Sequence, residues 1–359
     1  MNIEKSDAYI MLRSFLNKSS KHGSAQPGKG NKMPTVICSL PESRFEKYGV
    51  SWPKGWDIRY IERPINEAGR KEMQEGDYLL VDCMDKITRE MLEPCRKLKM
   101  LHVEGVSFNM VDVEGARELG IMVCNNKAVN AAAVAEHCVA LMLAGFRKVG
   151  WMDHNIRTCG YAKANELFVS QGVREIEGST IGMIGMGVIG REVAKRLAGW
   201  GCRLVYSDPV RMSKELEEAY GLEYLTQEEL MKQSDIISVH VPVLPSTINM
   251  INKDTIRLMK NDVLLVNVAR GEIVNNEDLA WALENNEIGF AALDTVAPEP
   301  MPEDHVLRNL SAEADARVIF TTHAAGRTDQ AFKRMLEWAI VSMQKMEAGD
   351  RPNNIVNGL

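Results

Sequence analysis

The chain has 359 residues, 45% hydrophobic and 26% charged, which is typical of a globular protein large enough for two domains. Its formal net charge of −6 provides no basic surface for nucleic acid, so we expect no nucleic-acid partner. The seven cysteines are scattered without a CxxC pair, and no apolar run reaches the length of a membrane span; we therefore expect a cytoplasmic protein without membrane association.

Residues 1–33 are expected to form a flexible extension, because residues 19–32 are rich in Gly, Ser and Lys. From Thr35 onward, short apolar runs alternate with helix-like segments. The expected strands are Thr35–Leu40, Asp57–Ile61, Tyr78–Asp82, Met100–Val103 and Ile121–Cys124, and the expected helices lie near Glu42–Tyr48, Asn66–Gln74, Thr88–Leu98 and Met110–Leu119. This alternation predicts an α/β domain with a parallel sheet covered by helices.

The segment Asn130–Val149 is the longest uninterrupted helix candidate. Its sequence, NAAAVAEHCVALMLAGFRKV, is too apolar for a helix with one exposed face. We therefore expect it to pack against two bodies, either both domains or a second subunit.

Residues 179–209 contain the clearest motif. An apolar run leads into Gly185–Gly190 (GMGVIG), a helical pattern follows, and a second apolar run ends at Asp208. This is the order of a dinucleotide-binding βαβ unit, although an ordinary turn between strand and helix is the alternative. Gly185 permits the tight turn, Gly187 leaves room for a pyrophosphate, and Gly190 allows close packing of helix on strand. Asp208 can bind ribose hydroxyls.

The alternation then continues to the end of the chain. The expected strands are Ile236–Val241, Val263–Val268, Phe290–Leu293 and Val318–Phe320; the expected helices begin at a capping box on Thr226 or lie near Asp254–Lys260, Glu277–Glu284 and Asp329–Met346. Nearly all-apolar strands are typical of a sheet that is buried on both faces, which predicts a second doubly wound α/β domain.

Three polar residues follow expected strands of this second domain: Arg270, Glu299 and His323. Ligands of such folds bind beyond the carboxyl ends of the strands. Arg270 could hold a substrate carboxylate with two hydrogen bonds, His323 could exchange a proton with a carbonyl oxygen, and Glu299 could fix the tautomer of the imidazole. Taken singly, each residue has a structural alternative: Arg270 in a surface ion pair, Glu299 as a solvated loop acid, and His323 as a hydrogen bonder at a strand end.

Together with GMGVIG, the segments VNVARGEIV, ALDTVAPEP and TTHAAGRT resemble the D-isomer-specific 2-hydroxyacid dehydrogenase family, and the resemblance covers nearly everything after residue 34. It implies an α/β protein of two doubly wound parallel-sheet domains. An NAD-binding Rossmann domain, residues 126–325, would be inserted into a discontinuous, flavodoxin-like substrate domain of residues 34–125 and 326–359. The implied activity is NAD-dependent interconversion of a 2-oxo acid and a D-2-hydroxy acid, and the implied assembly is a homodimer through the 130–149 helix region.

The resemblance also assigns residues. The implied catalytic residues are Arg270, Glu299 and His323. The implied cofactor contacts are Gly185, Gly187, Val188, Ile189, Gly190, Asp208, His240, Val241, Pro242, Thr247, Val268, Ala269, Asp294 and His323. Substrate binding is implied for the loop Gly105, Val106 and Ser107, through backbone amides, and for Arg270. We expect no metal, because Glu136 and His137 lack the spacing of a helical zinc pair.

Two questions stay open at this point. A nucleotide-sensing protein related to corepressors of the same fold is the alternative to an enzyme. The substrate side chain is not specified either: glyoxylate, hydroxypyruvate, branched or aromatic 2-oxo acids, phosphoglycerate and sugar acids are all compatible. The candidates for its pocket are Cys83, Met84, Lys86, Val106 and Phe108.

Overall fold

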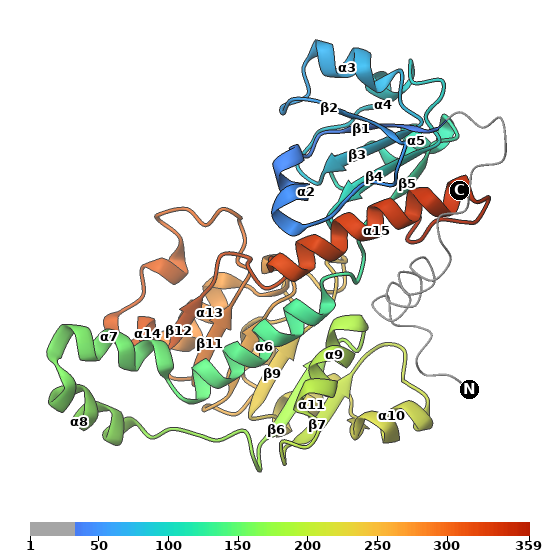
Figure 1. The fold of residues 1–359 in the computed structure, drawn as a ribbon. Coiled ribbons are helices and arrows are strands. Elements are labelled where there is room, and N and C mark those ends of the chain that lie inside the picture. The colour runs from blue at the N-terminus through green and yellow to red at the C-terminus, as the bar shows by residue number, and fades with distance from the viewer. Residues whose placement is uncertain (1–32) are drawn as a thin grey trace. The chain divides into compact units, whose positions relative to one another are not determined.

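The computed structural model describes residues 33–359 and divides them into two compact α/β units (Figure 1). The chain leaves the first unit after Asn130, forms the second as Ala131–Arg327, and returns to the first as Thr328–Leu359. The predicted extension lies outside the described residues apart from Met33. Within residues 33–359, none of the helices combines the length and apolarity that a membrane crossing requires.

The first unit is built on a five-stranded parallel sheet in the order β2-β1-β3-β4-β5, the flavodoxin-like arrangement. Its strands are β1 (Thr35–Cys38), β2 (Asp57–Tyr60), β3 (Tyr78–Asp82), β4 (Met100–Glu104) and β5 (Met122–Cys124), and its helices are α2 (Glu42–Tyr48), α3 (Glu67–Met73), α4 (Arg89–Leu92), α5 (Val113–Glu118) and α15 (Asp329–Glu347). The expected helix Thr88–Leu98 is shorter in the structure, because Pro94 has no amide hydrogen with which to continue the helical hydrogen bonds beyond α4.

The carboxyl-terminal helix α15 completes this first unit, although more than 200 residues separate it from β5 in the sequence. Its buried side chains Leu336, Ala339 and Met343 share one hydrophobic cluster with Tyr78 and Leu80 of β3. Figure 1 shows α15 (red) beside the blue helix α2. The amphipathic pattern seen in the sequence therefore serves to cover one face of a sheet formed by distant residues.

The second unit contains a seven-stranded parallel sheet in the order β12-β11-β10-β9-β6-β7-β8, which places the first strand of the unit, β6, inside the sheet between β7 and β9, where the strand order reverses as in Rossmann folds. Its strands are β6 (Thr180–Ile184), β7 (Arg203–Ser207), β8 (Leu222–Tyr224), β9 (Ile236–Val239), β10 (Leu264–Asn267), β11 (Phe290–Leu293) and β12 (Val318–Phe320). Its longer helices are α6 (Ala131–Phe146), α7 (Val149–Cys159), α8 (Tyr161–Gln171), α9 (Val188–Leu197), α10 (Lys214–Tyr220), α11 (Gln227–Gln233) and α13 (Asn276–Glu284); the short ones are α12 (Lys253–Ile256), α14 (Ala312–Asp315), η2 (Gly271–Ile273) and η3 (Val306–Arg308). The two parallel sheets confirm the predicted fold class.

The sheet of the second unit is buried on both faces, as its apolar strands predict. In β10, Leu264 and Val266 join a cluster on one face, while Leu265 joins the cluster on the other. The predicted capping box is also present, with Thr226 and Glu229 binding each other's backbone at the start of α11.

The prediction of one helix over Asn130–Val149 is wrong at its end. Helix α6 ends at Phe146, Lys148 adopts a left-handed backbone with φ 51°, and α7 starts at Val149. Helix α6 packs against α9 and the sheet, and a Cβ on Gly145 would lie only 2.8 Å from Leu264. Because this tight packing holds the end of α6 on the sheet, α7 leaves in a new direction; no residue of α7 is buried.

Candidate active site

A histidine–glutamate pair forms beyond the carboxyl ends of β11 and β12. The Nδ1 atom of His323 lies 2.9 Å from both carboxylate oxygens of Glu299. In the part of the chain that the structure describes, no protein group pairs with Nε2 of His323. Glu299 therefore favours a proton on Nδ1 and leaves Nε2 available to an external partner.

Arg270 lies on a neighbouring turn, immediately after β10. Asn267, the last residue of β10, shapes this turn by accepting from the Ala269 amide at 3.0 Å and donating to the Arg270 carbonyl at 2.9 Å. A Cβ on Gly271 would lie 2.2 Å from the Ala297 nitrogen, so only glycine lets this turn lie against the loop that carries Glu299. Among residues 33–359, the Arg270 guanidinium makes no ion pair with a carboxylate, and its NH1 donates to the Ala269 carbonyl at 2.7 Å.

Asp294 follows β11 and is almost completely buried. Its carboxylate accepts hydrogen bonds from the backbone amides of Ala324 and Ala325, at 2.8 and 3.0 Å, and from the Thr321 hydroxyl at 2.5 Å. Burial by itself raises the pKa of a carboxyl group, but the hydrogen bonds from His137, Thr321 and the two amides outweigh it and hold the pKa of Asp294 well below its usual range. The carboxylate is thus a fixed negative charge beneath the His323 turn.

The glycine motif forms an open turn between β6 and α9. Gly185 has φ 94°, and a Cβ there would lie 2.9 Å from the His240 carbonyl, whereas a Cβ on Gly187 would meet no atom within 4 Å. A Cβ on Gly190 would lie 2.5 Å from the Gly185 oxygen. The turn at Gly185, the open space at Gly187 and the close approach of Gly190 to the Gly185 carbonyl are compatible with a dinucleotide-binding turn.

Several groups around this turn suit a dinucleotide. Asp208 accepts hydrogen bonds from the Met186 and Val210 amides, at 2.8 and 2.9 Å, and these bonds fix its carboxylate at the end of β7. No side chain caps α9, so its first amides keep the positive end of the helix available to phosphate. Burial lowers the pKa of His240 to about 4, and its Nδ1 is a buried polar atom without a protein partner. Such an open cradle with an unsatisfied polar atom fits a bound NAD.

The other predicted cofactor residues follow the carboxyl ends of β6, β9 and β10. A Cβ on Gly185 would lie 2.9 Å from the Val241 side chain, so Val241 lies directly against the glycine turn. The Thr247 hydroxyl donates to the Pro242 carbonyl at 2.6 Å, which closes the loop after β9. Val268 and Ala269 are buried at the end of β10, and Val188 and Ile189 begin α9.

The predicted substrate loop belongs to the first unit, after β4. Gly105 has φ 147° and lies against Cys83; its amide donates to Asn126 Oδ1 at 2.9 Å. Asn125 Nδ2 donates to the Val106 carbonyl at 2.7 Å. Because the Gly105 amide is already paired, Val106 and Ser107 are the better candidates for anion binding in this loop.

A charged network at the same edge of the first unit was not identified from the sequence. The Arg44 guanidinium lies 2.5 Å from Glu104 and 3.4 Å from Asp82, and Arg63 bridges Asp82 and Asp85 at 3.1 and 2.6 Å. Burial, opposed by Arg44, raises the pKa of Glu104 from 4.5 to about 7. Each arginine is 19 or more positions from the acids that it pairs with, so no local sequence pattern reveals this network.

We predict that Glu104→Gln stabilises the protein more at pH 8 than at pH 5. Because the pKa of Glu104 is higher in the folded than in the unfolded chain, the wild type loses stability as pH rises from about 4.5 to 7. Glutamine does not ionise and so removes this loss of stability. At pH 8 the Tm of the variant is expected to exceed that of the wild type by about 2–4 °C. Thermal unfolding at both pH values, with the exposed Glu114→Gln as control, measures the effect; a lower Tm of the variant at pH 8 would show that the Arg44 ion pair dominates.

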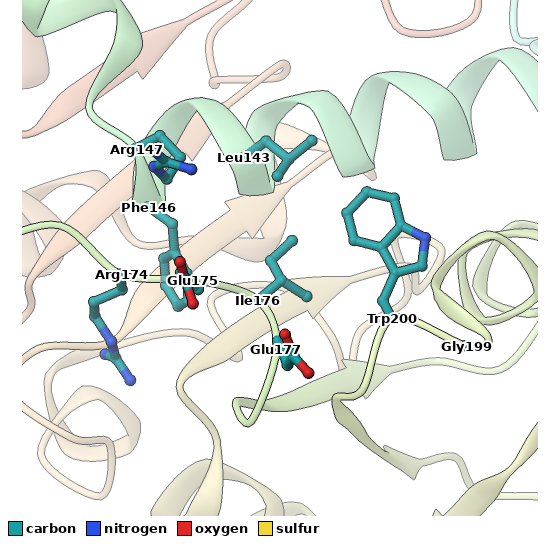
Figure 2. Close-up of a pocket in the computed structure, with 9 residues that line it drawn as sticks. All are labelled: Leu143, Phe146, Arg147, Arg174, Glu175, Ile176, Glu177, Gly199 and Trp200. Atoms are coloured by element: carbon teal, nitrogen blue, oxygen red, sulfur yellow. The ribbon is translucent and has the colours of Figure 1, made fainter.

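One further cavity, of about 450 Å³, lies in the second unit away from these groups. Figure 2 shows its lining, which comes from the end of α6, from the segment before β6 and from the turn after α9: Leu143, Phe146, Arg147, Arg174, Glu175, Ile176, Glu177, Gly199 and Trp200. None of these is a predicted site residue. Among the described side chains, no group of three or more His, Cys, Asp or Glu residues is arranged to hold a metal ion.

Comparison with known proteins identifies relatives of this arrangement. Residues 139–325 match the family model described as "D-isomer specific 2-hydroxyacid dehydrogenase, NAD binding domain". The chain is 32% identical to the glyoxylate reductase of Korarchaeum cryptofilum over 294 residues, which cover 82% of this chain and 86% of that protein. It is 33% identical over 288 residues to the D-3-phosphoglycerate dehydrogenase of Methanocaldococcus jannaschii, covering 80% of this chain and 53% of that protein. The crystal structure of D-lactate dehydrogenase with NAD⁺ from Lactobacillus jensenii superposes with a TM-score of 0.73 at 27% identity, covering 90% of this chain and 99% of that chain.

Proposed function

The chain belongs to the D-isomer-specific 2-hydroxyacid dehydrogenase family, and we propose that it interconverts a 2-oxo acid and a D-2-hydroxy acid. At the coarser level the family match makes it an NAD-dependent oxidoreductase of 2-hydroxy acids. The D-stereochemistry and the roles of individual residues are part of the proposal. The observation that carries it is the His323–Glu299 pair, with Nδ1 at 2.9 Å from the carboxylate and Nε2 free of protein partners among residues 33–359.

Each side chain has a defined task in the proposed reaction. Arg270, without a carboxylate partner among the described residues, binds the carboxylate of the substrate and polarises the adjacent carbonyl. In its doubly protonated form, His323 donates the Nε2 proton to the carbonyl oxygen and becomes the neutral imidazole, whose remaining Nδ1 proton is held by Glu299. NAD in its reduced form supplies the hydride when bound. In the oxidative direction, the same Nε2 accepts the hydroxyl proton.

A panel of 2-oxo acids tests the function and narrows the substrate. Glyoxylate, pyruvate, hydroxypyruvate, phenylpyruvate and phosphohydroxypyruvate are each mixed with NADH, and the absorbance of NADH is followed at neutral pH. Turnover of one of them, with the D-isomer as the product on chiral chromatography, supports the proposal. Tight NADH binding without turnover of any of them would instead support a nucleotide-sensing protein.

We further expect NADH to be preferred over NADPH. The Asp208 carboxylate disfavours a 2′-phosphate, and Arg211 is engaged by Glu217, with Nε and NH2 at 2.9 and 3.1 Å from its carboxylate. The kcat/KM for NADH should therefore exceed that for NADPH by about tenfold or more, which corresponds to roughly 1.4 kcal/mol. Asp208→Ala should lower the ratio of kcat/KM for NADH to kcat/KM for NADPH. Adding Glu217→Gln should lower this ratio further, because it releases Arg211. A higher kcat/KM with NADPH than with NADH in the wild type would contradict the assignment.

We propose a homodimer through the region of α6, α7 and α8. Helix α7 buries no residue within the described chain, and Val149, Ile156, Tyr161 and Val169 are apolar or aromatic side chains exposed on α7 and α8. The cavity of Figure 2 lies beside the end of α6, and its lining includes the half-exposed side chains of Leu143 and Trp200.

The mass in solution tests the homodimer. Light scattering after size exclusion should give about twice the 40.2 kDa chain mass. The double variant Ile156→Glu with Val169→Glu should give the mass of the monomer.

A further inference from the structure

A chain of hydrogen bonds connects helix α6 to the turn that carries His323. The Nε2 atom of His137, on α6, lies 3.0 Å from the Thr321 hydroxyl and 3.5 Å from Asp294 Oδ1. The Thr321 hydroxyl donates to the same Asp294 oxygen at 2.5 Å. Because the hydroxyl hydrogen is used towards Asp294, the Thr321 oxygen acts as the acceptor for a proton on Nε2 of His137.

The turn beyond Thr321 needs such an anchor. His323 has φ 50°, a left-handed backbone conformation that is unfavourable for a residue other than glycine and persists only where the surroundings hold it. Three backbone amides hold it there: His323 N donates to the Asp294 carbonyl at 2.8 Å, and Ala324 and Ala325 donate to the Asp294 carboxylate. The orientation of the imidazole towards Glu299 therefore depends on where the Asp294 carboxylate is fixed.

We propose that His137, acting through Thr321 and Asp294, is a positioning residue that sets the geometry of the His323–Glu299 pair. His137 has a half-buried side chain, with 26% of its area exposed, and in the described chain its Nε2 points at Thr321 and Asp294 rather than at Glu299 or His323. The hydrogen bond from His137 fixes the Thr321 hydroxyl, and the Thr321 hydroxyl in turn fixes the orientation of the Asp294 carboxylate. The backbone amides that donate to this carboxylate are then held in place as well. This inference rests on the proposed acid–base role of His323.

Two pairs of variants separate the hydrogen bond from the bulk of the side chain. His137→Phe keeps a ring but removes the donor, whereas His137→Gln places an amide N–H close to the position of Nε2. Thr321→Val removes the hydroxyl and keeps the shape, whereas Thr321→Ser retains the hydroxyl. Glu136→Gln, at the exposed neighbouring position on α6, is the matched control.

The expected result is a loss of kcat without a loss of binding. His137→Phe and Thr321→Val should each lower kcat roughly 10- to 100-fold, since a displacement of about 1 Å can cost that much in rate. The KM for the 2-oxo acid and the Kd for NADH should stay near the wild-type values. His137→Gln and Thr321→Ser should recover most of the rate, and the double variant His137→Phe with Thr321→Val should be no slower than either single variant. Because slower chemistry becomes rate-limiting, the deuterium isotope effect on kcat with NADD should rise in the two impaired variants.

The structural part of the inference has a readout that needs no turnover. In protein labelled with ¹⁵N-histidine, the ring nitrogens of His323 should show one tautomer with the proton on Nδ1 in the wild type and in His137→Gln. His137→Phe should show exchange between tautomers. If the wild type turns over no 2-oxo acid, the proposed function fails, and this spectrum still decides whether His137 positions the turn.

Three outcomes would overturn the inference: a wild-type kcat in His137→Phe, a loss that appears only in the Kd for NADH, or an unchanged His323 spectrum in His137→Phe. If His137→Phe does not fold, the Thr321→Val and Thr321→Ser pair carries the same test, because Thr321 is the next group in the chain of hydrogen bonds.

Discussion

Replacing His323 by alanine is expected to lower kcat by roughly 10²- to 10⁴-fold while NADH binding persists, because general acid–base catalysis contributes an effect of this size. The backbone bonds of the turn involve the amides of residues 323–325 rather than the imidazole, so the variant keeps its local structure. Steady-state rates with the best 2-oxo acid and a fluorescence titration with NADH measure the two quantities separately.

The matched control for His323→Ala is Thr322→Ala, which truncates the exposed neighbouring side chain. Glu299→Gln should give a smaller loss than His323→Ala, because an amide can still accept a hydrogen bond from Nδ1 but no longer stabilises a charged imidazole. A wild-type rate in His323→Ala would refute the role of His323 as proton donor and leave only a structural role for its pair with Glu299.

The second large effect is expected for Arg270→Lys, which should raise KM for the 2-oxo acid and lower kcat together. A lysine keeps the charge but offers a single ammonium in place of two parallel N–H groups, so the substrate carboxylate loses both binding energy and orientation. We expect kcat/KM to fall by roughly 10²- to 10³-fold, or about 3–4 kcal/mol of transition-state stabilisation.

Arg89→Lys, at an exposed ion pair of the first unit, serves as the control for Arg270→Lys. Binding of NADH should be unchanged in Arg270→Lys, since its proposed partner is the acid substrate. If only KM rises while kcat stays constant, Arg270 binds the carboxylate without polarising the carbonyl, and its proposed role must be reduced to binding.

Much of the fold could be predicted from local patterns. The sequence patterns locate every strand of the first unit within two residues. Strands β1, β3 and β4 are buried at every position and are mostly apolar, whereas the edge strand β2 alternates between exposed and partly buried residues. Strand β8 and helices α7, α8 and α10 were not predicted. Helix α7 has apolar residues at helical spacing, Val149, Met152 and Ile156, but they are too few to mark a helix on their own, and no residue of α7 is buried within the described chain.

Local patterns of residue types are enough to predict the class of fold, the glycine turn and an arginine, an acid and a histidine after three separate strands. Three contacts become visible only in the folded chain: Glu299 meets Nδ1 of His323, the turn after Arg270 lies against residue 297, and His137 reaches Thr321 from 184 positions away. Contacts of this kind depend on the order and register of parallel strands. Strand order is set by how helices and loops pack over the whole unit, and no local stretch of sequence specifies it.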